Sequence, residues 1–248
     1  MCLILCACTA KNEKTDNLNT ILERGKLIVG VRVDAKPFGF LDSSGKYQGY
    51  DVELAEKLAK SIFNSSSAVE FVPVTAQNRI SMLNSGKVDV LVAAVSVTEN
   101  RKILMDFSSP YFIAGQAVLV NQGSDITTLK ELNGKRVIIV YGSTGEMGVR
   151  RALPEAAVIG YKTYDEAIKA LKSGDADGLI SDDSILYGLT ANDKSVKILQ
   201  GRYSKEPYAV AFRKGKESEK LREHTNFFLQ ELARTGKLKK LQEQWGIK

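Results

Sequence analysis

Short apolar runs alternate with amphipathic segments along most of the chain. Lys26 to Val33 reads KLIVGVRV, and its many β-branched residues are typical of a buried strand. Residues 50–62 follow Gly49 with apolar positions at helical spacing. Strands that alternate with helices predict an α/β fold with largely parallel sheets. Further strands are expected at residues 69–74, 88–94, 114–120, 137–140, 158–161, 178–181 and 208–212, and further helices at 18–24, 77–84, 126–133, 146–153, 164–172, 184–189 and 218–245.

Two local signals refine these helices. Thr128 precedes Glu131 by three positions, the spacing of a capping box, so the helix at 126–133 is expected to begin with one. Gly236 interrupts the long C-terminal pattern and predicts a break there.

Two stretches of the chain repeat the same pattern. Residues 80–93 (ISMLNSGKVDVLVA) and 168–181 (IKALKSGDADGLIS) each contain a helix end, a Ser-Gly stop, an Asp and a short strand. KLIVGVRV at Lys26 and KRVIIVYG at Lys135 form a second pair. We therefore expect two similar lobes whose strands end towards a shared cleft, where ligand sites are common.

A guanidinium is predicted at the carboxyl end of one strand in the first lobe. The strand at 88–94 is followed by a helix cap, either Ser96 or Thr98, and then by Arg101. Ligands of open α/β sheets bind at this edge, and the planar fork of an arginine suits a carboxylate. The alternative is a surface cation that pairs with a nearby carboxylate such as Glu99.

The second lobe offers complementary groups. Ser143 and Thr144 lie in a turn between a strand and a helix, where free backbone N–H groups and the helix dipole favour an anion. Asp182 follows another strand and suits an ammonium group. An arginine, helix N–H groups and an aspartate together describe a clamp for the zwitterion of a free α-amino acid. The turn lacks the lysine of a phosphate-binding loop, so nucleotide binding is not supported.

Composition narrows the function further. The 248 residues carry 35 Lys and Arg against 29 Asp and Glu, a net charge of +6 that is scattered, so no nucleic-acid partner is expected. The single His and three N-terminal Cys leave no metal-ligand spacing in the body, and no cofactor is expected. Leu5 to Cys8 resembles a bacterial lipobox. Residues 1–17 are thus expected to be a lipoprotein-type signal remnant and tether, with Cys8 lipidated as a membrane anchor.

Three blocks of sequence are together specific enough to indicate a family. They read PFGF…GYDVELAEKLAK, SGKVDVLVAAVSVTENRK…DFSSPY and TTLKELNGKRVIIVYGST. The chain from Leu27 to Gly246 resembles the solute-binding proteins of bacterial polar amino-acid ABC transporters, which include glutamine-, histidine- and glutamate/aspartate-binding types. The resemblance implies a two-lobed, type II periplasmic-binding-protein-like fold. The implied limits are residues 18–112 and 208–248 for lobe 1 and 113–207 for lobe 2, with hinges near Ile113 to Ala117 and Tyr203 to Pro207.

The resemblance also implies roles and partners. Arg101 would hold the α-carboxylate, helped by Ser96 and the N–H of Thr144, and Asp182 would hold the α-ammonium. Tyr50 and Phe38 would pack against the ligand side chain. The implied ligand-binding set is Arg101, Asp182, Ser96, Ala94, Thr144, Ser143, Tyr50, Phe38 and Arg79. The partners would be a free L-amino acid and the permease subunits of the transporter. We expect an extracytoplasmic monomer, either periplasmic or anchored to the cell membrane.

The choice of ligand depends on Arg79 in this interpretation. Some relatives that bind acidic amino acids have Arg at this place, where it would favour an Asp or Glu side chain. Alternatively, Arg79 points outward or pairs with Asp51 or Glu53. Glutamate, aspartate or glutamine is the expected ligand, with cystine, cysteine or a basic amino acid as alternatives. A dehydratase-like enzyme on the same fold is the rival function, but one His and no Cys in the body favour a binding protein.

Overall fold

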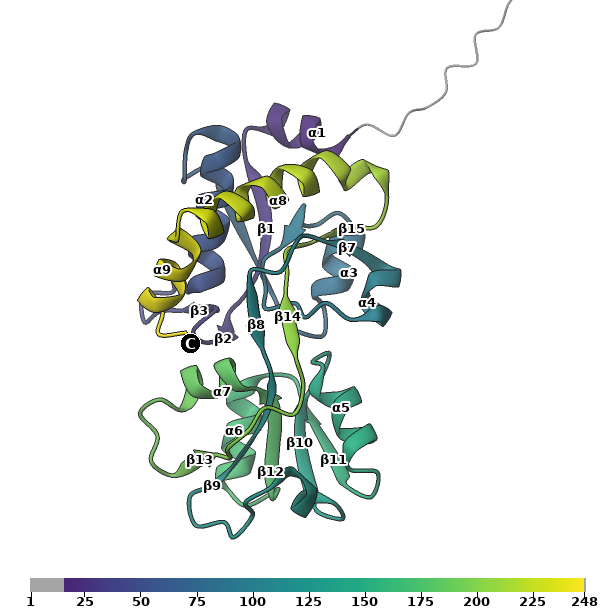
Figure 1. Cartoon of the computed structure of the whole chain (residues 1–248), viewed down its shortest axis with the longest axis vertical. Helices are drawn as coiled ribbons and strands as arrows, with labels where there is room; N and C mark the ends of the chain where they lie inside the picture. Colours follow the sequence, from purple (N-terminus) through teal and green to yellow (C-terminus); the bar gives the residue numbers. More distant parts are fainter. Residues whose placement is uncertain (1–15, 248) are drawn as a thin grey trace, which may run out of the picture.

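The computed structural model describes residues 16–247, so Cys8 and its predicted lipidation lie outside the described residues. The chain forms two lobes, one above the other, joined by the strands β8 (Phe112–Ala114) and β14 (Glu206–Tyr208) (Figure 1). The fold is therefore the two-lobed α/β arrangement that the repeated pattern and the family blocks predict.

Lobe 1 is built on a sheet with the order β5-β1-β6-β15-β7. β1 pairs in parallel with β5 and β6, and its burial agrees with its continuous apolar sequence. β15 pairs antiparallel with β6 and β7. The strands are β1 Leu27–Arg32, β5 Val69–Val74, β6 Val90–Leu91, β7 Met105–Phe107 and β15 Ala211–Arg213, beside a small sheet of β2 Asp34–Ala35, β3 Gly39–Leu41 and β4 Tyr47–Gln48.

The two longest helices of lobe 1, α2 and α8, bury one apolar face each. α2 buries residues at helical spacing, and the carboxylates of its first turn suit the positive end of the helix dipole. The predicted break at Gly236 is present, with φ of 70°, and separates α8 from α9. The helices are α1 Asn17–Arg24, α2 Tyr50–Phe63, α3 Arg79–Asn84, α4 Glu99–Leu104, α8 Glu219–Arg234 and α9 Lys237–Gln244, with a 3₁₀ turn at Lys216–Ser218.

Lobe 2 repeats the plan of lobe 1. The series β10-α5-β11-α6-β12 has the same order and the same parallel pairing as β1-α2-β5-α3-β6. The repeated stretches at 80–93 and 168–181 thus take equivalent places in the two sheets. The elements are β9 Gln116–Asn121, β10 Arg136–Val140, β11 Ala157–Tyr161, β12 Gly178–Asp182, β13 Val196–Ile198, α5 Gly145–Ala152, α6 Tyr164–Lys172, α7 Asp183–Thr190 and a 3₁₀ turn at Leu129–Leu132.

The connection between the lobes is a pair of antiparallel strands, β8 Phe112–Ala114 and β14 Glu206–Tyr208. β8 leads into β9 of lobe 2, and β14 leads back to β15 of lobe 1 (Figure 1). β8 shares residues 113–114 with the first predicted hinge, and β14 shares residues 206–207 with the second. We propose that the lobes meet at the limits inferred from the sequence, residues 112–113 and 207–208.

Most strands of each sheet run in the same direction, as predicted, but one strand in each sheet is reversed. β9 in lobe 2 and β15 in lobe 1 each pair antiparallel with both of their neighbours. The reason is the hinge. β9 and β15 each enter a sheet directly from a hinge strand, so they run away from the cleft, whereas strands that follow a crossover helix run towards it.

Local corrections concern caps and strand lengths. Residues 129–132 form a 3₁₀ turn, and the side chain of Thr128 makes no cap hydrogen bond. Glu131 instead accepts the N–H of Thr127 at 2.7 Å, and the capping box lies at Thr163 and Glu166. Of the expected strand at 88–94, only Val90–Leu91 is paired as β6.

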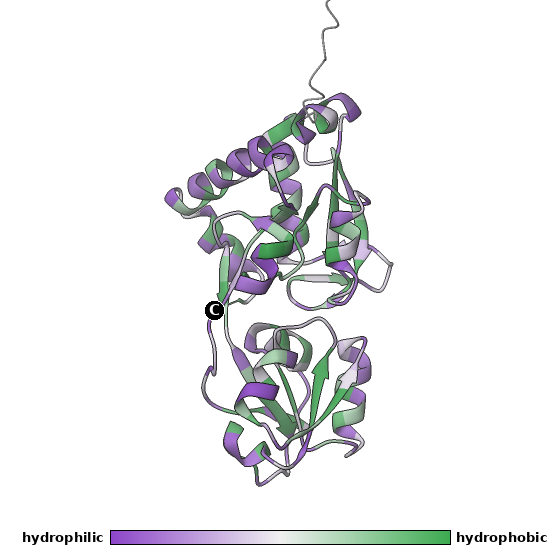
Figure 2. Cartoon of the chain, turned by 90° about the vertical axis from the view of Figure 1, so that its right-hand side faces the viewer, coloured by the Kyte–Doolittle hydropathy of each residue, from purple (hydrophilic) through white to green (hydrophobic). Residues whose placement is uncertain are grey.

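The apolar residues lie between each sheet and its helices. Figure 2 shows the strands of both lobes as apolar and the outer helix surfaces as hydrophilic. Val29 and Val90 of lobe 1, like Ile138 and Leu179 of lobe 2, are completely buried. Along residues 16–247, no helix is both long and apolar enough to cross a membrane.

Candidate functional site

Arg101 lies at the boundary between the lobes. The hydroxyl of Thr98 accepts the N–H of Arg101 and caps α4, as predicted. The buried guanidinium donates to the carbonyl of Ser96 and, across the boundary, to the carbonyl of Gly142 in lobe 2, both at 2.9 Å. Burial lowers the pKa of Arg101. The alternative of a solvated surface cation is therefore wrong.

The backbone before Arg101 is held in an unusual conformation. Ala94 has φ of 48°, a region that residues with a Cβ rarely adopt. Its N–H donates to the buried carboxylate of Asp51 at 2.7 Å, and its carbonyl accepts from Arg79 at 3.0 Å. Burial raises the pKa of Asp51 to about 7. Strained backbone that the surroundings hold from both sides is characteristic of functional sites.

Arg79 is buried, with 2% of its surface exposed, so the interpretation that it points outward is wrong. It donates to the carbonyl of Ala93 at 2.7 Å, besides that of Ala94, and to Gly142 at 3.4 Å across the boundary. Burial lowers its pKa to about 9, and the nearby charge of Arg101 acts in the same direction. Its described polar contacts are to backbone carbonyls, so its side chain holds the backbone that follows β6 in place.

Lobe 2 contributes the turn between β10 and α5. Gly142 takes the left-handed conformation, with φ of 76°, and presents its carbonyl to both arginines. Thr144 is buried, and its hydroxyl accepts from the side-chain amide of Gln116 at 3.0 Å. The hydroxyl of Ser143 is buried without a hydrogen-bond partner in the described chain. The predicted turn thus faces Arg101 directly.

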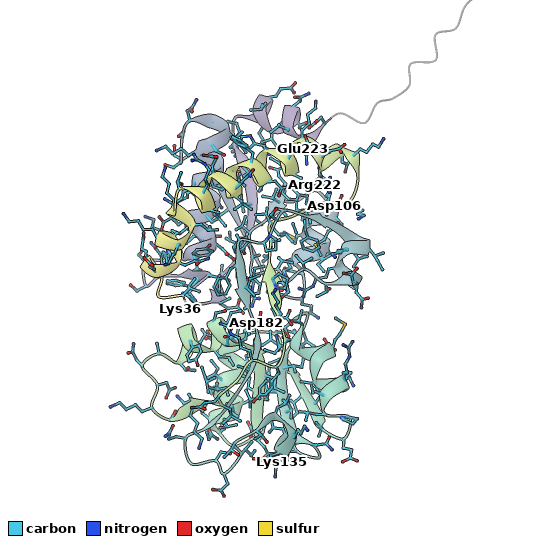
Figure 3. The ribbon with its side chains drawn as sticks, in the orientation of Figure 1. Lys36, Asp106, Lys135, Asp182, Arg222 and Glu223 are labelled. Carbon is cyan, nitrogen blue, oxygen red and sulfur yellow. The ribbon has the colours of Figure 1, made fainter. Side chains whose placement is uncertain are left out.

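Asp182 ends β12 and lies where the lobes meet (Figure 3). Its carboxylate accepts hydrogen bonds from the amide of Gln116 and from the hydroxyl of Tyr208 on the hinge strand β14. Burial raises the pKa of Asp182 to about 6, while Tyr208 and Arg101 favour the charged form. The adjacent Asp183 instead accepts the N–H of Gly115 at 3.2 Å and pairs with Arg202.

Phe38 and Tyr50 lie in a cluster of buried aromatic rings in lobe 1. The ring of Phe38 is 5.9 Å from Tyr50 and 5.1 Å from Tyr208, measured between centroids. The hydroxyl of Tyr50 donates to the carbonyl of Tyr111 at 3.2 Å. Both rings are completely buried, so the cluster supports the hinge strand that carries Tyr208. Their contact with a ligand side chain stays a prediction.

Sequence reasoning missed Gln116 and Tyr208, which both contact Asp182. Gln116 interrupts the apolar run IAGQAVLV within a predicted hinge, and a polar residue there is the available signal. The sequence predicts Tyr208 only as the start of a strand. An antiparallel β-bridge between Ser96 and Tyr208 brings this strand against the residues that precede Arg101. No local sequence pattern predicts that pairing.

The fold and these facing groups define a class of protein, the two-lobed binding proteins whose lobes are joined by paired strands. Residues 27–248 match the bacterial extracellular solute-binding proteins, family 3, and the chain belongs to this family. Such proteins act outside the cytoplasm.

Named relatives agree with this assignment. The chain is 37% identical over 238 residues to the ABC transporter glutamine-binding protein GlnH of Bacillus subtilis, covering 95% of this chain and 86% of that protein. It is 39% identical over 204 residues to a glutamine-binding protein of Geobacillus stearothermophilus, covering 82% and 78%. The structure of an ancestral arginine-binding protein bound to glutamine superimposes with a TM-score of 0.83 at 39% identity, covering 90% of this chain and 98% of that one.

Proposed function

We propose that this protein is the substrate-binding component of an amino-acid ABC importer and that it captures a free polar L-amino acid, glutamine first, between its lobes. The observation that carries the proposal is the opposition of Arg101 and Asp182 at the boundary. One comes from each lobe, both are buried, and their charges interact. Buried charges of opposite sign on separate lobes match the carboxylate and ammonium of one zwitterion.

The assigned roles follow the geometry. Arg101 holds the α-carboxylate, with Ser96 and the N–H of Thr144 beside it, and Asp182 holds the α-ammonium. A ligand with both charged groups contacts both lobes, so it stabilises their closed arrangement. Ala94 and Ser143 line the same boundary through their backbone and hydroxyl groups, and Phe38 and Tyr50 lie behind it.

Glutamine is preferred over glutamate for a structural reason. An acidic side chain needs a cation that is free to pair with it, but Arg79 is already engaged by the carbonyls of Ala93, Ala94 and Gly142. The glutamine-binding relatives support the same choice. Aspartate, cystine, cysteine and basic amino acids are the remaining candidates, and each is distinguished by titration.

Delivery requires a partner in the membrane. The permease subunits of an ABC importer are the proposed partner. A lipid anchor at Cys8 and a monomeric state complete the proposal for an extracytoplasmic protein.

Titration with single amino acids tests the function. Thermal unfolding and calorimetry against the twenty amino acids and cystine should show a rise in melting temperature for the true ligand, because a ligand of the native state stabilises it by mass action. The rival is a dehydratase-like enzyme, which the raised pKa of the buried Asp182 favours as a proton donor. Consumption of prephenate-like acids, without any amino acid shifting the melting temperature, would replace transport by catalysis.

Acidification is expected to weaken amino-acid binding while it stabilises the ligand-free protein. Asp182 must be ionised to hold an ammonium, and its pKa is about 6. Affinity should therefore fall about ten-fold between roughly pH 7.5 and pH 5. The raised pKa values of Asp182 and Asp51 mean that the native state takes up protons before the unfolded chain does, so stability rises as pH falls through this window. Calorimetry and thermal melts at both pH values check this. Affinity that is independent of pH contradicts it.

Arg79→Ala is expected to weaken the binding of all amino acids alike. The variant leaves the buried carbonyls of Ala93 and Ala94 unpaired, so the free energy of unfolding should fall by about 3 kcal/mol. Urea unfolding and titration with glutamine and glutamate measure both effects, with the exposed Arg150→Ala as the control. A selective loss of glutamate binding would instead make Arg79 the residue that reads the ligand side chain.

A further inference from the structure

Helix α7 of lobe 2 touches lobe 1 at Gly188. A Cβ on this residue would lie 2.5 Å from the carbonyl oxygen of Lys36 and 2.6 Å from Cδ of Pro37, below the 3.0 Å that real Cβ atoms keep. Gly188 lies inside the helix and has no left-handed backbone that would call for glycine. The requirement for glycine therefore comes from the other lobe.

The loop on the lobe 1 side has little freedom to yield. The carbonyl of Pro37 accepts the N–H of Tyr50 at 2.9 Å, and the carbonyl of Phe38 accepts the N–H of Asp51 at 2.8 Å. These bonds fasten the loop to the start of α2. The contacting atoms include backbone atoms of Lys36, which cannot turn away as the end of a side chain can.

Helix α7 is fixed to lobe 2 in the same way. The N–H of Asp183, its first residue, donates to the carbonyl of Gly115 beside the hinge at 2.8 Å. Ile185 and Leu186 are buried in the core. An added methyl at Gly188 must therefore move one lobe against the other.

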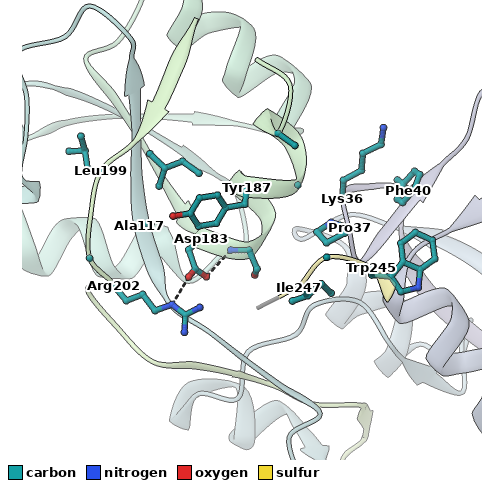
Figure 4. Close-up of a pocket in the computed structure, with 16 residues that line it drawn as sticks. Lys36, Pro37, Phe40, Ala117, Asp183, Tyr187, Leu199, Arg202, Trp245 and Ile247 are labelled. Carbon is teal, nitrogen blue, oxygen red and sulfur yellow. Dashed lines mark hydrogen bonds and ion pairs between the residues drawn. The ribbon is translucent and has the colours of Figure 1, made fainter. Parts of the chain in front are cut away.

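The contact borders a pocket of about 900 Å³ that both lobes line. Figure 4 shows the helix with Asp183 and Tyr187 on one side and Lys36, Pro37 and Trp245 on the other. A second glycine makes a similar approach elsewhere on the boundary, since a Cβ at Gly142 would lie 2.5 Å from the carbonyl oxygen of Ala76. The lobes thus meet at two glycine positions where only backbone fits.

We propose that Gly188 is a positioning residue that sets the separation of the lobes in the ligand-holding form. This inference rests on the proposed function, because a ligand held by Arg101 and Asp182 needs both lobes at one spacing. Gly188→Ala adds the methyl that the contact excludes, and it holds the lobes apart without touching the ligand groups themselves.

Gly188→Ala and Gly148→Ala form a matched pair. Gly148 also lies inside a helix of lobe 2, but a Cβ there has no neighbour within 4 Å. Alanine improves helix propensity at both positions, so neither ligand-free variant should melt below wild type. In glutamine titration, Gly188→Ala should bind at least about ten-fold more weakly than wild type, whereas Gly148→Ala should bind like wild type. Small-angle X-ray scattering should show that it compacts less than wild type at saturating glutamine.

The outcomes separate the two proposals. Equal affinity and equal compaction in Gly188→Ala and wild type overturn the role of Gly188. A large drop in its ligand-free melting temperature also overturns it, because the contact would then serve folding. If wild type binds no amino acid, the proposed function fails. The role of Gly188 then fails with it, because there is no ligand-holding form whose lobe separation the contact could set.

Discussion

Arg101→Ala is expected to bind every amino acid at least about 100-fold more weakly than wild type. The guanidinium is buried, spans the boundary through Gly142, and is the proposed partner of the α-carboxylate common to all candidate ligands. Removing one member of a buried, hydrogen-bonded charge pair leaves the other charge without its counterion. Calorimetric titration with glutamine and with the next best ligand measures the loss.

Two controls interpret that loss. Arg101→Lys keeps the charge but not the planar fork, so it should recover only part of the affinity. Lys102→Ala removes the neighbouring cation, which forms an exposed pair with Glu99, and should bind like wild type. Affinity that survives in Arg101→Ala would place the carboxylate site elsewhere.

Asp182→Asn is expected to cause a loss of similar size by a different route. The carboxylate is the proposed partner of the α-ammonium, and an amide of nearly the same shape removes the charge that attracts it. The oxygen of the new amide can still accept the bond from Gln116, and its NH2 can donate to the hydroxyl of Tyr208, which then acts as the acceptor, so the local geometry should be largely kept. We expect affinity to fall about 100-fold and the dependence of binding on pH to disappear.

The matched control lies at the other end of the same strand. Asp175→Asn changes an exposed carboxylate just before β12 and should leave affinity and pH dependence unchanged. The test is sharpest when both substitutions are titrated at two pH values. If Asp182→Asn kept the full pH dependence, another group would have to be its source, and Asp51 is the next candidate.

Much of the secondary structure could be predicted because it depends on local pattern. α6, the break at Gly236 and the cap of α4 by Thr98 follow from periodicity and capping chemistry within a few residues. The antiparallel members of each sheet could not be predicted in this way. Their direction depends on where the chain enters from the hinge, which is a property of the whole topology.

Some residues of the candidate site could likewise be identified from the sequence, and others only from the structure. Arg101, Thr144 and Asp182 follow strands or begin helices, and those local positions are enough to identify them in the sequence. Gln116 and Tyr208 become recognisable only through their hydrogen bonds to Asp182. Arg79 stands out in the sequence, but only the structure shows its bonds to backbone carbonyls, and its part in choosing the ligand stays a prediction.

A two-lobed α/β protein with an arginine in one lobe and an aspartate in the other could be predicted from the sequence alone. The signals that predict it are visible in the sequence itself: helical and strand periods, caps and a repeated pattern. The charge of a side chain is likewise known without the fold. Which groups meet across the boundary, and how closely, depends on the packing of one lobe against the other. The contact of Gly188 with Lys36 and Pro37 is the clearest case, since these residues are far apart in the chain and only the packing of one lobe on the other brings them together.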